Sequence, residues 1–252
     1  MPIRQLKKIA ALGAELREHL AQRGASAVAY ADLTELPVES RGGLRSGVSI
    51  ALALDPQIVA GLHSNSGALA YAAEYQRANA HLNALADLAV EFLRQRAFRS
   101  VALAATTSAF SRSTFATTLP HKTVATRAGL GWIGRSALLV TEEFGSAIRL
   151  ATVLTAAELP YGVPVESSAC GDCHACVQAC PVRALTGNLW QKTTSRNELC
   201  DAEVCYRHLR ERRRRANLDA TVCGLCLQAC PRTQRYLSEC AARAVSGQAA
   251  GK

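Results

Sequence analysis

The sequence predicts an α+β protein in which an N-terminal domain of alternating helices and strands precedes a smaller cysteine-rich domain. Long segments carry apolar residues at helical spacing, short apolar runs lie between them, and all ten cysteines lie beyond residue 169. Alternating helices and strands predict a layered domain, and 252 residues, 49% of them hydrophobic, suffice for a substantial core. We expect domains at 1–160 and 161–243 and a flexible tail at 244–252.

Each expected element follows from its local pattern. The first helix has Leu6, Leu16 and Leu20 on its apolar face and ends at Gly24. Short apolar runs bounded by glycine or Asp-Pro predict buried strands. In chain order, we expect helix 3–23, strands 27–33 and 47–54, helix 66–96, and strands 101–105 and 148–154.

Several classes of protein are excluded by composition. The first helix is interrupted by charges, including Lys7, Lys8 and Glu15, so it is not the apolar region of a signal peptide. No apolar run approaches the length of a membrane span. We therefore expect a cytoplasmic protein with no membrane partner. The net charge of +9 suits nucleic acid, phosphate-bearing ligands or an acidic redox partner, without choosing among them.

The cysteines carry the clearest chemical signal. Residues 170–181 read C-x2-C-x2-C-x3-C-P, the run that holds iron–sulfur clusters in bacterial ferredoxins. A shorter run at 223–231 repeats the ending, and Cys200 and Cys205 lie between the two. In such runs the fourth cysteine, next to proline, ligates the other cluster.

Two [4Fe–4S] clusters need eight of the ten cysteines. We assign the first cluster to Cys170, Cys173, Cys176 and Cys230. The second takes Cys180, Cys223, Cys226 and either Cys200 or Cys205, which leaves Cys240 and one other as ordinary thiols. A zinc site is the alternative, but it needs only four ligands, usually as two separated C-x2-C pairs. Disulfides do not suit a reducing compartment.

A glycine-rich block precedes the cysteines. Gly129, Gly131 and Gly134 formally match G-x-G-x-x-G, but a helical segment precedes the block and a strand-like one follows it. A nicotinamide site needs the reverse order. The glycines instead indicate a tight turn or the close approach of a flat ligand. Residues 92–141 contain no Asp or Glu, which indicates either an anion-tolerant face or simply an Ala- and Arg-rich composition.

A second basic stretch, 207–215, lies between the two cysteine runs. It is either a solvated helix face or a docking patch for RNA phosphates or an acidic electron donor. Only Tyr206 is near it, so base stacking is not indicated.

The segment 120–140, the order of the parts and the lone cysteine before the second run resemble the epoxyqueuosine reductase family and its shorter relatives. The resemblance covers most of 66–240. In that pattern the lone cysteine has a leucine four residues later, which Cys205 and Leu209 match, so Cys205 is favoured over Cys200.

The resemblance implies an N-terminal domain like the nitroreductases and corrinoid-binding reductive dehalogenases, joined to a two-cluster ferredoxin-like domain. It implies cobalamin as a cofactor beside the clusters, and reduction of an epoxide on a queuosine precursor in tRNA. We expect a short member, without the C-terminal helical-repeat domain. The family's acidic residues are also absent: the aspartate slot falls near Phe115 and the glutamate slot at His121.

We therefore expect an enzyme, an iron–sulfur oxidoreductase that passes electrons to a corrinoid or substrate at the N-terminal domain. The alternatives are an epoxyqueuosine reductase acting on tRNA, and a ferredoxin-like carrier or reductive activator without catalysis. Expected partners are reduced flavodoxin or ferredoxin as donor, and a small molecule, a corrinoid protein or tRNA. His121 is the expected proton donor, unless it only begins a helix. Expected cofactor contacts are Lys122, Gly129, Gly131, Trp132, Gly134 and Arg135.

Overall fold

The computed structural model describes residues 2–106, 115 and 117–249. The chain forms two compact units, and both are discontinuous in sequence. The first comprises residues 1–52, 78–131 and 149–166, and the second comprises residues 53–77, 132–148 and 167–252. A single boundary near 160 was predicted, and the observed division differs from it.

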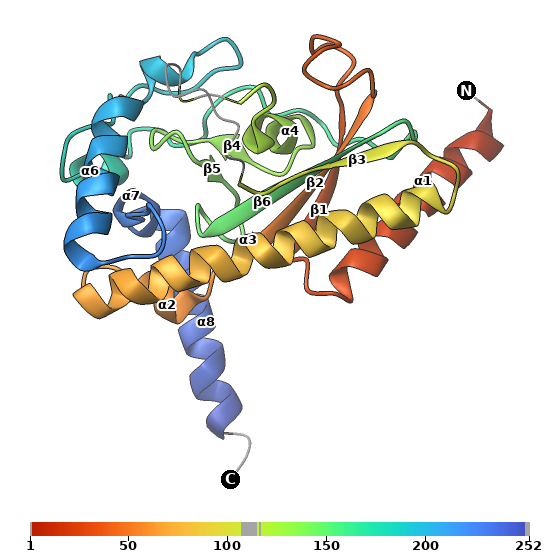
Figure 1. Ribbon diagram of the computed structural model, residues 1–252. Helices are drawn as coiled ribbons and strands as arrows, with labels where there is room; N and C mark the ends of the chain where they lie inside the picture. Colours follow the sequence, from red (N-terminus) through yellow and green to blue (C-terminus); the bar gives the residue numbers. More distant parts are fainter. Residues whose placement is uncertain (1, 107–114, 116, 250–252) are drawn as a thin grey trace. The chain divides into compact units, whose positions relative to one another are not determined.

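The first unit is built on a four-stranded sheet of order β1-β2-β6-β3 (Figure 1). Its strands are β1 (Ala27–Asp32), β2 (Ser46–Ala53), β3 (Ser100–Leu103) and β6 (Ile148–Thr155). The outer pairs are antiparallel, with Tyr30 opposite Val48 and Val101 opposite Leu154. The structure confirms all four predicted strands, with ends shifted by one or two residues.

Alternation along β1 separates the two faces of the sheet. Ala31 belongs to a buried cluster with Val124 of helix α4 (His121–Arg127). Tyr30 points the other way, where its hydroxyl donates to the carbonyl of Gly13 in helix α1 (Ile3–Ala21). Successive side chains of a strand face opposite sides, so this sheet is buried on both.

Helix α3 (Asn65–Arg94) confirms the long helix expected at 66–96, and it runs through both units. Leu82, Leu85 and Leu93 on its later half are fully buried in the first unit. Its first half belongs to the second unit with the short helix α2 (Pro56–Ala60), where Asp55 caps the first turn by accepting from two backbone N–H groups.

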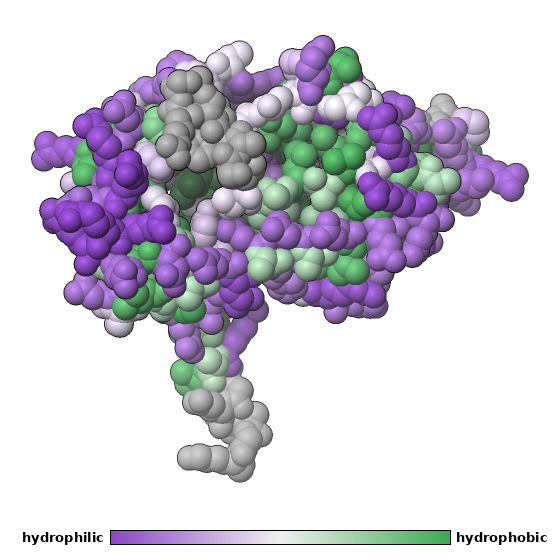
Figure 2. All heavy atoms as spheres, in the orientation of Figure 1, coloured by the Kyte–Doolittle hydropathy of each residue, from purple (hydrophilic) through white to green (hydrophobic). Residues whose placement is uncertain are grey.

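The second unit collects short elements around the cysteines. They are strands β4 (Trp132–Ile133) and β5 (Leu139–Val140), helices α5 (Ala175–Gln178), α6 (Ala202–Ala216), α7 (Leu225–Gln228) and α8 (Pro231–Ala249), and the 3-10 turn Arg196–Glu198. Helix α5 packs on α7, and α2 on α8. Figure 2 shows a strongly hydrophilic surface over α6.

Long-range contacts explain why this unit reaches back to residue 53. The hydroxyl of Tyr236 on α8 donates to the carbonyl of Leu54, and Gln228 donates to the carbonyl of Ala60. Thr233 accepts from the backbone N–H of Ser146. Sequence patterns do not report such pairings. Helix α8 extends to Ala249, and the flexible tail expected at 244–252 stays a prediction.

Candidate metal centre

The two cysteine runs form the same local structure. In each, a short helix carries the middle cysteine, Cys176 on α5 and Cys226 on α7, and the run ends in an Ala-Cys-Pro sequence. Because α5 and α7 pack together, the two runs face one another. None of the ten cysteines forms a disulfide.

One group of thiols surrounds Cys176. Burial raises the pKa of this thiol to about 11, and the nearby thiols Cys170, Cys230 and Cys173 add to the shift. Cys230 belongs to the second run, so it has crossed to join the first. These four thiols are the set predicted for the first cluster. The structure brings them together, while their ligation of a cluster stays a prediction.

A second group surrounds Cys226. Burial raises the pKa of this thiol to about 12, and Cys223, Cys205, Cys176 of the first group and Cys180 contribute in the same direction. Cys180 has crossed from the first run. The crossing places both Cys-Pro cysteines beside the opposite run, as in two-cluster ferredoxins.

The second group holds one thiol more than a cluster needs. Cys200 and Cys205 share a hydrogen bond that raises the pKa of Cys205 and lowers that of Cys200. Cys200 also lies near Cys226 and Cys180. Cys205 is in the first turn of α6, capped by Asp201, whereas Cys200 lies before the helix. Both thiols therefore reach the same site, and the preference for Cys205 stays a prediction.

The donor set fits iron–sulfur clusters. Soft thiolates in sets of four are the ligands that these clusters require. Within the described residues, no three His, Cys, Asp or Glu side chains converge closely enough to hold a single metal ion.

Hydrogen bonds from other residues also reach the sulfurs. The indole N–H of Trp132 donates to Sγ of Cys170 over 3.4 Å, and the backbone N–H of Ala184 donates to Sγ of Cys180 over 3.3 Å. Such bonds stabilise negative charge on cluster sulfurs and tune the reduction potential. A Cβ atom added to Gly134 would lie 3.4 Å from the Cys170 sulfur, so this glycine keeps the site open.

Arg135 is buried, with 7% of its surface exposed, against the loop that begins at Cys170. Its guanidinium donates to the carbonyls of Gly171 and Gly187, and its Nε has no partner. A buried cation without a carboxylate is costly unless other negative charge is near. Negatively charged thiolates around a cluster supply that charge.

The predicted cofactor block is divided between the two units. Gly129 lies in the first, with φ of +73°, and an added Cβ would come 2.7 Å from the carbonyl oxygen of Val163. Gly131 and Lys122 lie in the same unit, whereas Trp132, Gly134 and Arg135 lie in the second beside Cys170. Close packing thus accounts for Gly129 without any ligand.

Both ring nitrogens of His121 are engaged. Nδ1 lies 2.9 Å from the hydroxyl of Thr152, and Nε2 lies 2.9 Å from the carbonyl of Ala104. A carbonyl only accepts, so Nε2 carries the proton and Nδ1 accepts from Thr152. Burial lowers the pKa of His121 and keeps the ring neutral. This geometry favours its structural role at the start of α4.

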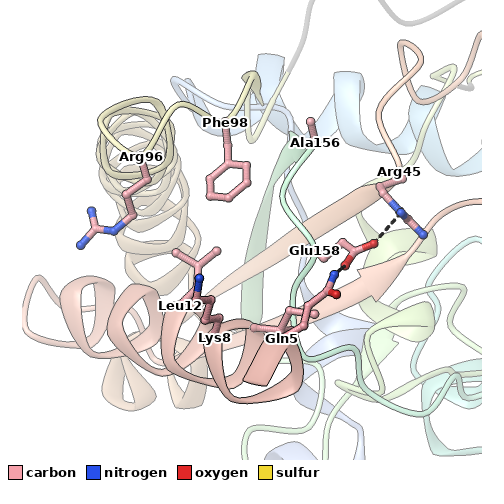
Figure 3. Close-up of a pocket in the computed structure, with 9 residues that line it drawn as sticks. Gln5, Lys8, Leu12, Arg45, Arg96, Phe98, Ala156 and Glu158 are labelled. Carbon is pink, nitrogen blue, oxygen red and sulfur yellow. Dashed lines mark hydrogen bonds and ion pairs between the residues drawn. The ribbon is translucent and has the colours of Figure 1, made fainter. Parts of the chain in front are cut away.

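A hollow of about 580 Å³ lies in the first unit between α1 and the residues after β6 (Figure 3). Phe98 and Leu12 line it, and the Arg45–Glu158 ion pair, 2.7 Å long, closes one side. It contains no nucleophile beside a base, and we assign it no chemistry.

Comparisons with known proteins follow this geometry. The family model described as a 4Fe-4S double cluster binding domain matches residues 169–233. Epoxyqueuosine reductase from Listeria monocytogenes is 44% identical over 64 residues, which are 25% of this chain and 17% of that protein. The enzyme of the same name from Atelocyanobacterium thalassa is 29% identical over 131 residues, 48% of this chain and 40% of that protein.

The solved structures agree on the fold. A crystal structure of epoxyqueuosine reductase matches with a TM-score of 0.60 at 21% identity, covering 92% of this chain and 67% of that one. A reductive dehalogenase matches with a TM-score of 0.60 at 17% identity, covering 88% and 31%.

The chain is an epoxyqueuosine-reductase-like iron–sulfur protein. It carries a double [4Fe–4S] cluster domain at its C-terminal end, and the fold class predicted from the sequence is confirmed. The matches span less than half of the curated relatives' length. In the described part of the chain, no helix combines the length and apolarity needed to cross a membrane.

Three contacts escaped the sequence reasoning: the indole of Trp132 on Cys170, the clamp of Arg135 on the cysteine loop, and the backbone bond to Cys180. The block around Trp132 was noticed, but it was interpreted as a cofactor site. No sequence signal pairs it with a cysteine loop almost forty residues later.

Proposed function

We propose that this chain is an iron–sulfur oxidoreductase that passes single electrons through two [4Fe–4S] clusters to an acceptor bound by the first unit. The observation that carries the proposal is the crossing of Cys180 and Cys230, which gives two mixed sets of thiols. Because the sets share two runs packed on one another, electrons have a short route between them.

The residues around the thiols have separate tasks. Cys170, Cys173, Cys176 and Cys230 would hold the first cluster, and Cys180, Cys223, Cys226 and Cys205 the second. Bound clusters supply one-electron chemistry. Trp132 and Arg135 would stabilise added negative charge at the first set, because one donates a hydrogen bond and the other brings a buried cation.

The acceptor we propose is a corrinoid. Its support is the fold shared with a reductive dehalogenase whose structure was described as suggesting a mechanism for B12-dependent dehalogenation. The residues expected to contact it do not fit that role well. Trp132, Gly134 and Arg135 lie against the cysteine loop, and Gly129 packs on Val163. We therefore derive no step through a corrinoid.

A second candidate function is the reduction of epoxyqueuosine in tRNA. A relative named epoxyqueuosine reductase from Gloeobacter violaceus is 45% identical over 65 residues, and a structure of an epoxyqueuosine reductase holds a tRNA stem loop. The proton source is the open point for this chain. His121 is engaged on both nitrogens, and the aspartate position falls near Phe115, whose neighbours 107–114 and 116 lie outside the described residues.

The test is anaerobic reconstitution followed by iron and sulfide analysis, cobalamin titration, and turnover of tRNA carrying epoxyqueuosine. The proposal predicts about eight iron atoms per chain and a change in the corrinoid absorption spectrum. Conversion of the tRNA would establish the second candidate. Eight iron atoms without any corrinoid response would leave a non-enzymatic carrier or another acceptor. Zinc in place of iron would overturn the proposal.

A further inference from the structure

Helix α6 carries an unusual concentration of positive charge. It has six arginines against two glutamates: Arg207, Arg210, Arg212, Arg213, Arg214, Arg215, Glu203 and Glu211. Glu211 pairs with Arg214 and Arg215, and Glu203 lies 3.7 Å from Arg207. Among the described residues, Arg210 and Arg212 pair with no carboxylate. The surface that these six arginines form around most of the helix circumference, here called the α6 face, keeps a large positive excess.

The α6 face is hollowed rather than flat. Where it meets the start of α3, a hollow of about 490 Å³ is lined by Arg212, Arg215, His63 and Leu69. Leu69 is 51% exposed and lines this hollow together with Ala68 and Ala216. Protein–protein interfaces combine such apolar side chains with a polar rim.

A second hollow lies along α6 itself. It has a volume of about 1150 Å³ and is lined by Arg207, Arg210, Arg213 and Arg214 together with Val204. The two hollows adjoin, because His208 and Glu211 line both of them.

The α6 face also lies beside the second set of thiols. Cys205 is on the same helix, less than two turns before Arg210. A partner seated on this face would therefore be near the second cluster rather than the first.

We propose that the α6 face docks an acidic one-electron donor protein, which reduces the second cluster. This inference rests on the proposed function, because it needs a cluster held by Cys180, Cys205, Cys223 and Cys226. The donor loses one electron and the cluster gains it, with no bond made or broken. Complementary charge would accelerate the encounter, and Leu69 would supply a desolvated contact.

RNA fits this surface less well than a protein does. Phosphates would suit the arginines, but single-stranded RNA is held by aromatic rings on which bases stack. Tyr206 and His208 are the only ring-bearing residues of α6. The exposed apolar side chain beside the arginines, Leu69, is aliphatic, which suits a protein partner.

The experiment is stopped-flow reduction of the oxidised, reconstituted protein by photoreduced flavodoxin at varied salt. We compare the wild type, R210E/R215E and the control R4E/K7E. The two variants change the net charge equally, but the control changes exposed residues of α1. Iron content and the rate with dithionite, a small reductant that needs no docking surface, are measured in parallel.

We expect the wild-type rate constant to fall about tenfold between roughly 20 and 300 mM salt. R210E/R215E should be roughly tenfold slower at low salt and nearly independent of salt. R4E/K7E should stay within about twofold of the wild type, and dithionite should reduce all three alike. L69S should slow the reaction at every salt concentration, because it removes an apolar contact.

Equal slowing by both double variants would overturn the proposal, since net charge would then suffice. Unchanged reduction by flavodoxin together with lost binding of a tRNA stem loop would also overturn it and would assign the face to RNA. If R210E/R215E lost iron, R210Q/R215Q would replace it. A wild type that binds no clusters would instead refute the proposed function, so the two failures are distinguishable.

Discussion

The two cysteine runs share the sequence C-x2-C-x-Gln-Ala-Cys-Pro, yet their surroundings differ. The first run lies beside two polar partners, the indole of Trp132 and the buried guanidinium of Arg135. The second set has backbone donors, from Ala184 to Cys180 and from Leu225 to Cys223, but no buried guanidinium like that of Arg135. Its surroundings are also apolar, because Gly224 packs against Leu62 and Tyr71. The same motif therefore supplies thiols to two different electrostatic environments.

This difference predicts which of the two clusters has the higher reduction potential. A positive charge and a hydrogen bond stabilise the reduced, more negative state of a cluster, whereas burial among apolar groups destabilises it. We therefore expect the first cluster to have the higher potential. Electrons would flow from the second cluster, beside the α6 face, to the first.

The largest effect should come from removing a ligand. C176S and C226S should each lower the iron content from about eight to about four atoms per chain, because a serine hydroxyl is a poor ligand for iron–sulfur clusters. Iron analysis measures the loss, and electron paramagnetic resonance of the surviving cluster identifies it. Retention of eight iron atoms in either variant would contradict the assignment of these thiols.

Variants of Cys205 and Cys200, the two candidates for the fourth ligand of the second cluster, serve as controls. C205S should lose the second cluster, and C200S should keep eight iron atoms, since Cys205 is the favoured ligand. The reverse outcome would move the ligand to Cys200 and would leave the crossing of the runs intact.

The next prediction tests whether Arg135 acts on the first cluster through its charge or by positioning the cysteine loop. R135M should lower the potential of the first cluster by roughly tens of millivolts, whereas the potential of the second should barely change. R135K keeps the charge and should recover most of the shift. Potentiometric titration measures both. If both variants shifted the potential equally, Arg135 would act by positioning the loop and not by its charge.

A smaller effect concerns backbone strain in the two loops. Gly171 and Gly224 both have positive φ, 53° and 82°. A Cβ atom on Gly171 meets nothing within 4 Å, whereas one on Gly224 lies 2.9 Å from Leu62 and Tyr71. G171A should cost about 1–2 kcal/mol of unfolding free energy from strain alone, and G224A should cost more. Thermal unfolding of the apoprotein tests the order, and equal costs would contradict it.

The smallest effect is a pH dependence of the apoprotein. Burial raises the pKa of Cys176 to about 11 and that of Cys226 to about 12. The folded state thus favours the protonated thiols, a contribution fully present below the unfolded pKa of about 8.5. Stability should fall as the pH rises from there toward 11. C176A/C226A should show a weaker decline, and an identical decline would exclude these thiols as its cause.

Much of this fold could be predicted from local patterns. The helices that contain Leu16 and Leu85 were found from apolar periodicity, because burial of one face imposes that period. The strands that contain Tyr30 and Val153 were found as short apolar runs. The units could not be found that way. Tyr236 meets Leu54 across most of the chain, and no local pattern encodes such a pairing.

At the candidate site too, some features could be predicted from the sequence and others could not. The spacing of the cysteines alone predicted that Cys180 and Cys230 each join the thiols of the opposite run. In runs with this spacing, the cysteine next to proline ligates the other cluster. The role of Arg135 was not predicted. Its block was interpreted as a cofactor site, and only the folded chain brings it to the carbonyl of Gly171.

The most direct test of the central claim is a potentiometric titration of the reconstituted protein, followed by electron paramagnetic resonance. C176S and C226S provide the reference spectra that assign each signal to one cluster. The account predicts two separate midpoints, with the first cluster, held by Cys170, Cys173, Cys176 and Cys230, at the higher potential. A first cluster at an equal or lower potential would contradict it.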